Sequence, residues 1–150
     1  GGSGVAVLWQ CGKYYKKAVD EFMAGVSAPG GIHSDFIQRM DLAYAAADIV
    51  ISRSGASSVS ELCAAHKAVI FVPSPNVAED HQTHNAMALV RQDAAILVKD
   101  IDAKEQMVGT ALALINDDEQ LKVLHENILT LALPDSARHI AEEVMKLAKK

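Results

Sequence analysis

The sequence predicts an α/β fold, in which a parallel sheet is flanked by helices and the C-terminal third is helical. Several short runs of β-branched and other apolar residues lack polar alternation, which is typical of parallel strands covered on both faces. Segments with a helical pattern separate these runs, and such alternation indicates right-handed crossover connections. The last third carries helical patterns with no strand between them.

Five apolar runs predict strands, and a helix is expected after each. The strands are expected at 5–9, 32–37, 48–52, 68–72 and 94–98. In the first helix, expected from Tyr14 to Met23, the apolar residues Ala18, Phe22 and Val26 fall roughly on one face. Asp117-Asp118 and Pro134-Asp135-Ser136 mark the boundaries of the last three helices, which are expected at 104–115, 119–131 and 136–148.

Composition indicates a globular domain of 150 residues, with 50% apolar and 22% charged residues. The net charge of −5 argues against a nucleic-acid surface, which would need a basic stripe. Cys11 and Cys63 have no metal-ligand spacing, and two lone cysteines suit a reducing cytosol. No apolar segment approaches the ~20 residues of a membrane span, and no signal peptide is visible.

The stretch 48–62 is the most informative part of the chain. A buried strand leads into a turn of small residues around Gly55, and a helix follows. The N–H groups and the positive dipole end of such a helix favour anions at the carboxyl edge of the sheet. On spacing alone the alternative is favoured, in which Ser58 and Glu61 form a capping box with no ligand role, because capping boxes are commoner than nucleotide sites.

A second polar segment follows the next strand. The run 68–72 leads into Pro73-Ser74-Pro75-Asn76, and a polar helix start follows at 80–85. Two adjacent strand ends are therefore expected to present polar groups at one edge of the sheet.

The motifs Arg53-Ser54-Gly55-Ala56, Ser60-Glu61 and His81-Gln82 through Asn85-Ala86 occur in this order. With them the chain resembles the C-terminal domain of the bacterial peptidoglycan glycosyltransferases that add N-acetylglucosamine (GlcNAc) to lipid I. Trp9-Gln10-Cys11-Gly12-Lys13 and Tyr44-Ala45-Ala46-Ala47-Asp48 extend the resemblance over nearly all of 5–150. It implies one Rossmann-like half of a GT-B type, inverting enzyme.

The resemblance also implies roles for individual residues. Glu61 would bind the ribose of uridine, Gln82 would read the donor sugar, and Ile37 would offer backbone groups to uracil. Arg53 would either contact a phosphate or brace the turn. The substrate-binding residues expected in this way are Ile37, Arg53, Ala56, Ser57, Ser58, Val59, Ser60, Glu61, Gln82 and Asn85.

Neither a metal nor a cofactor is expected. Asp80, His81 and His84 could share a helix face, but no fourth ligand stands at a recognisable spacing. No catalytic residue is expected in this chain either, since the resemblance implies a general base on another domain.

The resemblance implies a UDP-GlcNAc-binding domain for peptidoglycan synthesis, and hence for cell shape and division. Lipid I and the membrane surface would be reached through a missing N-terminal domain, with the enzyme peripheral on the cytoplasmic side of the inner membrane. The fragment alone should be inactive. Alternatives are a stand-alone binding subunit that needs a partner chain, or half of a sugar-nucleotide epimerase, for which His81 and His84 are the only hint.

Residues 1–4 have two interpretations. Gly1-Gly2-Ser3-Gly4 is favoured as a linker, which leaves 5–150 as the binding domain without its first strand–helix unit. The alternative is a remnant of the Gly-Gly-Ser phosphate loop that the resemblance implies.

Overall fold

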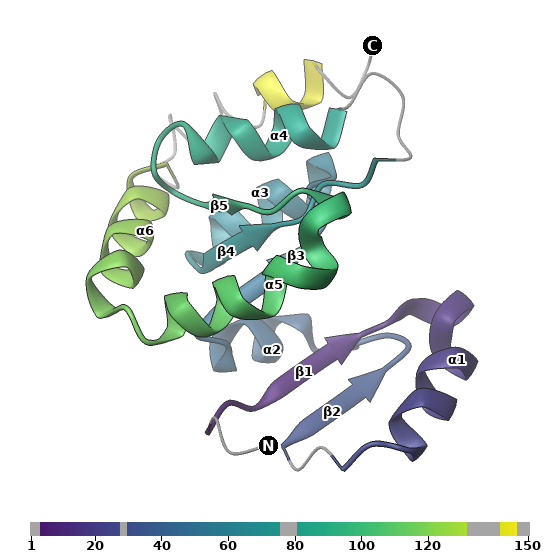
Figure 1. Cartoon of the computed structure of the whole chain (residues 1–150). Helices are drawn as coiled ribbons and strands as arrows, with labels where there is room; N and C mark the ends of the chain where they lie inside the picture. Colours follow the sequence, from purple (N-terminus) through teal and green to yellow (C-terminus); the bar gives the residue numbers. More distant parts are fainter. Residues whose placement is uncertain (1–3, 28–29, 76–80, 132–141, 147–150) are drawn as a thin grey trace. The chain divides into compact units, whose positions relative to one another are not determined.

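The computed structural model describes residues 4–27, 30–75, 81–131 and 142–146. The chain divides into two compact units, Gly1–Ala46 and Ala47–Lys150, and each is described by itself. The strands pair in parallel, as the alternation predicts, and they form one sheet of two strands and one of three (Figure 1).

The first unit consists of two strand–helix pairs. Its elements are β1 (Val7–Gln10), α1 (Gly12–Ala24), β2 (Gly31–Ser34) and α2 (Met40–Ala46). Beyond the paired strands, the N–H of Cys11 donates to the carbonyl of Ser34 and that of Gly12 to the carbonyl of Asp35, at 2.9 and 3.0 Å. Gly12 needs a φ of 77° to turn from β1 into α1, which glycine adopts without strain.

The structure corrects the predicted packing of the first unit. Val19 is the buried residue of α1, whereas Phe22 is 65% exposed, so the predicted Ala18–Phe22–Val26 face is wrong. The strand expected at 32–37 ends at Ser34, and Phe36 lies outside it with 61% exposure. Helical spacing defines several possible faces of α1, and only packing against the sheet selects one.

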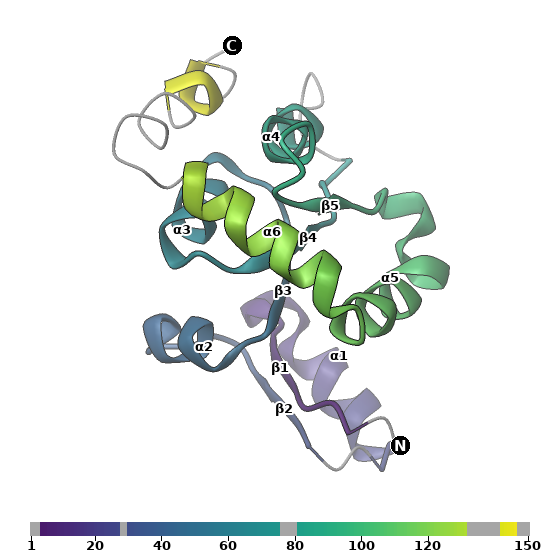
Figure 2. The same ribbon diagram turned by 90° about the vertical axis from the view of Figure 1, so that its left-hand side faces the viewer.

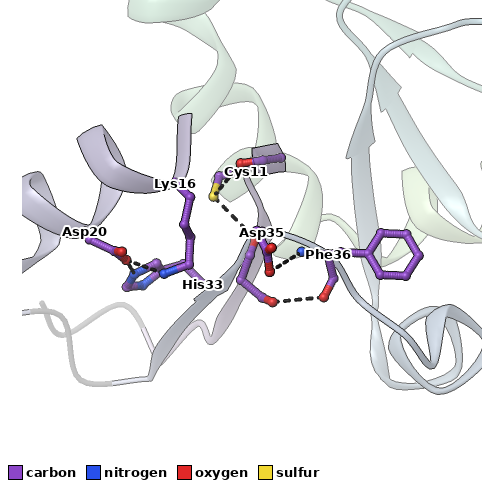
Figure 3. Close-up of polar contacts among 8 residues, drawn as sticks. Cys11, Lys16, Asp20, His33, Asp35 and Phe36 are labelled. Atoms are coloured by element: carbon purple, nitrogen blue, oxygen red, sulfur yellow. Dashed lines mark hydrogen bonds and ion pairs between the residues drawn. The ribbon is translucent and has the colours of Figure 1, made fainter. Parts of the chain in front are cut away.

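A polar cluster joins α1 to β2. Asp20 Oδ1 accepts hydrogen bonds from Lys16 Nζ at 2.5 Å and lies 2.8 Å from His33 Nε2 (Figure 3). The hydrogen bonds from Lys16 and His33 hold the pKa of Asp20 below its usual value, and the bond to Asp20 raises the pKa of Lys16. Nearby, Phe36 is held through its backbone, and its ring points away from the cluster.

The second unit is a layered α/β structure. Its sheet has the order β3-β4-β5, formed by Ile49–Ser52, Ala68–Phe71 and Ile96–Leu97. The helices are α3 (Ala56–Ala65), α4 (His81–Val90), α5 (Asp100–Ile115) and α6 (Asp118–Leu131). Figures 1 and 2 together place α3 and α5 on opposite sides of the sheet.

Strand β4 is the centre of the core and is buried on both faces, as its unbroken apolar run predicts. Ala68, Ile70 and Val72 pack with Leu114 of α5 and Leu124 of α6. On the alternate face of the strand, Val69 and Phe71 are fully buried as well. The loop that follows β4 therefore begins at the buried core of this unit.

The C-terminal helices largely agree with the prediction. α5 begins at Asp100 and not at 104, because Asp100 and Asp102 suit the positive end of the helix dipole. The boundary at Asp117 is confirmed, since its Oδ1 accepts a hydrogen bond from the N–H of Gln120 at 3.0 Å. Residues 142–146 are helical. The rest of the helix expected at 136–148 lies outside the described residues, among which no helix has the length and apolarity to cross a membrane.

Candidate functional site

The loops after β3 and β4 leave the sheet at the same edge. The two strands are parallel, and Ser52 at the end of β3 is paired with Phe71 at the end of β4. The polar residues 53–55 and 73–75 therefore follow neighbouring strand ends, which confirms the arrangement that the sequence predicts. This edge is where open α/β sheets place their ligands.

Helix α3 begins at this edge with no side-chain cap. Gly55 is its N-cap residue, with φ −61° and ψ 156°, and the N–H of Val59 donates to the Gly55 carbonyl at 3.0 Å. The N–H groups of Ala56, Ser57 and Ser58 precede that bond, so they lie outside the regular helical ladder. This turn therefore offers three consecutive amides to an anion.

The capping box at Ser58 and Glu61 is wrong. Ser58 is the third residue of α3, three positions after the N-cap Gly55, and Glu61 lies exposed in the second turn. Gly55 adopts the extended N-cap conformation, so the helix begins three residues before the capping box would place it. Glu61 thus has no capping role, and its carboxylate faces solvent.

Two of the expected binding residues differ in what they can offer. Val59 is fully buried, and its N–H is bonded within the helix, so the structure does not support a direct ligand contact for it. Ser60, one position further on, is exposed.

Arg53 braces the turn. Its Nη1 donates to the carbonyls of Val72 and Pro73 at 3.1 and 3.4 Å, and to Asp100 Oδ1 at 2.5 Å. Of the two interpretations of Arg53, these contacts support the brace. The side chain ties three segments together: the β3–α3 turn, the loop after β4 and the start of α5.

Gln82 and Asn85 of α4 converge on Ser54 in the β3–α3 turn. Gln82 Oε1 accepts hydrogen bonds from the N–H of Ser54 at 3.3 Å and of Ser74 at 2.8 Å. Ser54 Oγ donates to the Gln82 carbonyl at 2.6 Å, and Asn85 Nδ2 donates to the Ser54 carbonyl at 2.9 Å. Gln82 Nε2 lies beside the N-cap of α3, 3.9 Å from where a Cβ on Gly55 would stand.

Ser54, Ser74 and Asp100 also belong to this site, although none of them is in the predicted binding set. Ser54 had one signal, because it is a polar residue at the last position before the glycine of the turn. No sequence signal points to Asp100, because its ion pair with Arg53 joins residues that are 47 positions apart.

Ile37 belongs to the first unit. Its backbone N–H donates to Gln10 Oε1 at 2.9 Å, so that N–H is already engaged within the first unit. The same unit contains an apolar cavity of about 350 Å³. No residue of the predicted binding set lines this cavity, so it is not a candidate for the site.

The histidines of α4 do not form a recognisable metal site. Within the described residues, no three His, Cys, Asp or Glu side chains lie close enough together to hold a metal ion. His84 is exposed on α4, and Asp80 lies outside the described residues.

Comparisons with known proteins show the family of this chain. Residues 2–143 match the model of the glycosyltransferase family 28 C-terminal domain. An N-acetylglucosamine transferase of Bacteroides thetaiotaomicron, named as acting on N-acetylmuramyl-(pentapeptide) pyrophosphoryl-undecaprenol, is 56% identical over 97% of this chain and 39% of its own length. The Parabacteroides distasonis protein of the same name is 52% identical over 99% of this chain and 40% of its own length.

A solved structure gives the same result. The crystal structure of Acinetobacter baumannii MurG matches 95% of this chain and 42% of its own, with a TM-score of 0.74 and 27% sequence identity. The chain thus spans about two fifths of the length of these relatives. On the match over 2–143, the chain belongs to the glycosyltransferase family 28 C-terminal domain family.

Proposed function

We propose that this chain is the donor-binding part of a glycosyltransferase that transfers GlcNAc from UDP-GlcNAc to lipid I in peptidoglycan synthesis. The turn at the start of α3, with its three uncapped amides, is the observation that carries the proposal. The names of the relatives, with about half of all residues identical, support the substrate pair.

The amides of Ala56, Ser57 and Ser58 would bind the diphosphate of UDP. A helix N-terminus favours negative charge through its free N–H groups and its dipole. Negative charge grows on UDP as the sugar leaves in an inverting transfer, so these groups would stabilise the transition state more than the bound substrate. Small residues are sufficient here because the backbone makes the contacts.

The remaining groups would select the nucleotide and the sugar. The exposed Glu61 carboxylate can accept hydrogen bonds from both hydroxyls of a ribose. The carbonyl of Ile37 can accept a hydrogen bond from uracil. Gln82 would present Nε2 to the hexose, since its Oε1 is engaged by Ser54 and Ser74.

Other parts of the enzyme would supply the acceptor chemistry. The lipid I site, the general base and the membrane-contacting surface would lie on polypeptide outside this chain, which covers about two fifths of the length of its relatives. The enzyme would be peripheral on the cytoplasmic face of the membrane. The isolated chain should bind the donor without transferring the sugar.

Calorimetry or ligand-observed NMR on the 150-residue chain tests the nucleotide assignment. UDP and UDP-GlcNAc should bind weakly, and ATP and GTP should bind more weakly still. Equal affinities for UDP and ATP would exclude the uridine assignment.

Glu61→Gln is the matched variant for the ribose contact. It keeps the shape of the side chain and removes the charge, so UDP should bind more weakly. The melting temperature should stay unchanged, because Glu61 is exposed and does not cap α3. A lower melting temperature together with normal UDP affinity would show that Glu61 has only a structural role.

A further inference from the structure

Ser54 is held by α4 through every polar group that it has. It is fully buried, and its N–H, its carbonyl and its Oγ are each hydrogen-bonded to Gln82 or Asn85. Ser54 directly precedes Gly55, the N-cap of α3. Gln82 and Asn85 of α4 therefore fix the position of the first amides of α3.

Gln82 Oε1 is the acceptor that joins the two loops. It receives the N–H of Ser54 from the β3–α3 turn and the N–H of Ser74 from the loop after β4. One side-chain oxygen thus links the two loops that follow neighbouring strands. The resemblance assigns Gln82 to sugar recognition, which does not explain these two bonds.

Asn85 is buried, with 2% of its surface exposed, and its Oδ1 has no hydrogen-bond partner among the described residues. A buried unsatisfied acceptor costs free energy that an apolar side chain of similar size would avoid. An amide at this position is therefore explained by the hydrogen bond that its Nδ2 donates to the Ser54 carbonyl.

We propose that Gln82 and Asn85 are positioning residues for the diphosphate, which act through Ser54 and not through contact with the phosphates. They hold the turn so that the amides of 56–58 point to one place. This inference rests on the proposed function, because it assumes that those amides bind UDP. It also implies that the affinity for UDP depends on Gln82, although UDP carries no sugar.

The experiment compares Gln82→Met and Asn85→Leu with the unmodified 150-residue chain. Methionine is close to glutamine in length, and leucine keeps the branching of asparagine with a larger volume, while both remove the hydrogen-bonding atoms. His84→Ala is the matched control, since His84 is exposed on the same helix turn. Binding of UDP, UDP-GlcNAc and uridine is measured by ligand-observed NMR, and melting temperatures are recorded alongside.

Both variants should weaken the binding of UDP by roughly three- to tenfold, as expected for the loss of a neutral hydrogen bond. Asn85→Leu should weaken the binding of UDP-GlcNAc by the same factor as that of UDP, whereas Gln82→Met should weaken it at least as much, because it also removes the Nε2 proposed to meet the hexose. Uridine, which has no phosphate, should bind as before, and His84→Ala should bind all three ligands normally. Asn85→Leu removes the unsatisfied Oδ1 but leaves the buried Ser54 carbonyl without its donor, so some loss of melting temperature is expected as well. A side chain needed only for folding would weaken uridine and UDP binding alike.

Several results would overturn the inference. If Gln82→Met weakens UDP-GlcNAc and leaves UDP unchanged, Gln82 reads only the sugar. If the binding of uridine weakens as much as that of UDP, the variant has damaged the fold in general. If a folded Asn85→Leu binds UDP normally, Asn85 has no positioning role. If the unmodified chain binds no UDP, the proposed function itself fails, which is distinct from each of these outcomes.

Discussion

Gly55 shows how one residue without a side chain decides the chemistry of the turn. The spacing of Ser58 and Glu61 predicts a capping box, but the helix begins at Gly55 and leaves both residues inside α3. A serine or aspartate at the N-cap would satisfy one of the free amides with its own side chain. Glycine leaves them available, which is what an anion site requires.

At the same scale, the two cysteines should differ in reactivity. Cys63 of α3 is buried, and burial raises its pKa to about 11, so it stays a protonated, unreactive thiol at pH 8. Cys11 is partly exposed. Iodoacetamide at pH 8 should label Cys11 in the native chain and both residues in denaturant, as read by mass spectrometry. Equal native labelling rates would contradict the burial of Cys63.

The raised pKa of Cys63 also sets a pH dependence of stability. The pKa of an unfolded cysteine thiol is 9.0, whereas burial raises the pKa of Cys63 in the folded chain to about 11. The contribution of Cys63 to the free energy of unfolding is therefore complete below pH 9 and is lost as the pH rises toward 11.

Among the elements, the start of α5 is coupled to the β3–α3 turn. Asp100 lies in the first turn of α5, and its carboxylate binds the same Arg53 nitrogen that reaches the loop after β4. Three elements that are distant in the sequence therefore share one side chain at the edge of the site.

A double-mutant cycle with Arg53→Met and Asp100→Asn measures this coupling. The pair is partly exposed, so we expect a coupling energy of about 0.2–1 kcal/mol in the free energy of unfolding. Denaturant unfolding of the two single variants and the double variant gives the value. Strict additivity would mean that Arg53 holds the turn through the carbonyls of Val72 and Pro73 alone.

In the whole molecule, the two units differ in how much apolar surface they bury. Among the described residues of the first unit, Val19 is the only buried apolar side chain, and all four residues of β1 are exposed. In the second unit, β4 is buried on both faces between layers of helices. The second unit therefore has the core that can hold a binding site rigid.

Hydrogen exchange should report this difference. The amides of β4 should exchange at the slow limit set by global unfolding, whereas those of β1 and β2 should exchange much faster through local opening. Amide exchange followed by NMR gives both rates in one experiment. Equal protection of β1 and β4 would show that the first unit is stabilised more than its burial indicates.

The sequence by itself determined the alternation of strands and helices, the parallel pairing, the boundary at Asp117 and the turn of small residues after β3. These features depend on local patterns of apolar residues, glycine and capping residues. Only the tertiary structure decided three other features: the buried face of α1, the contacts of Arg53, and the hydrogen bonds that Gln82 and Asn85 make to Ser54. Ser54 and Gln82 are 28 residues apart and Arg53 and Asp100 are 47 apart, and such contacts exist only once the elements have packed.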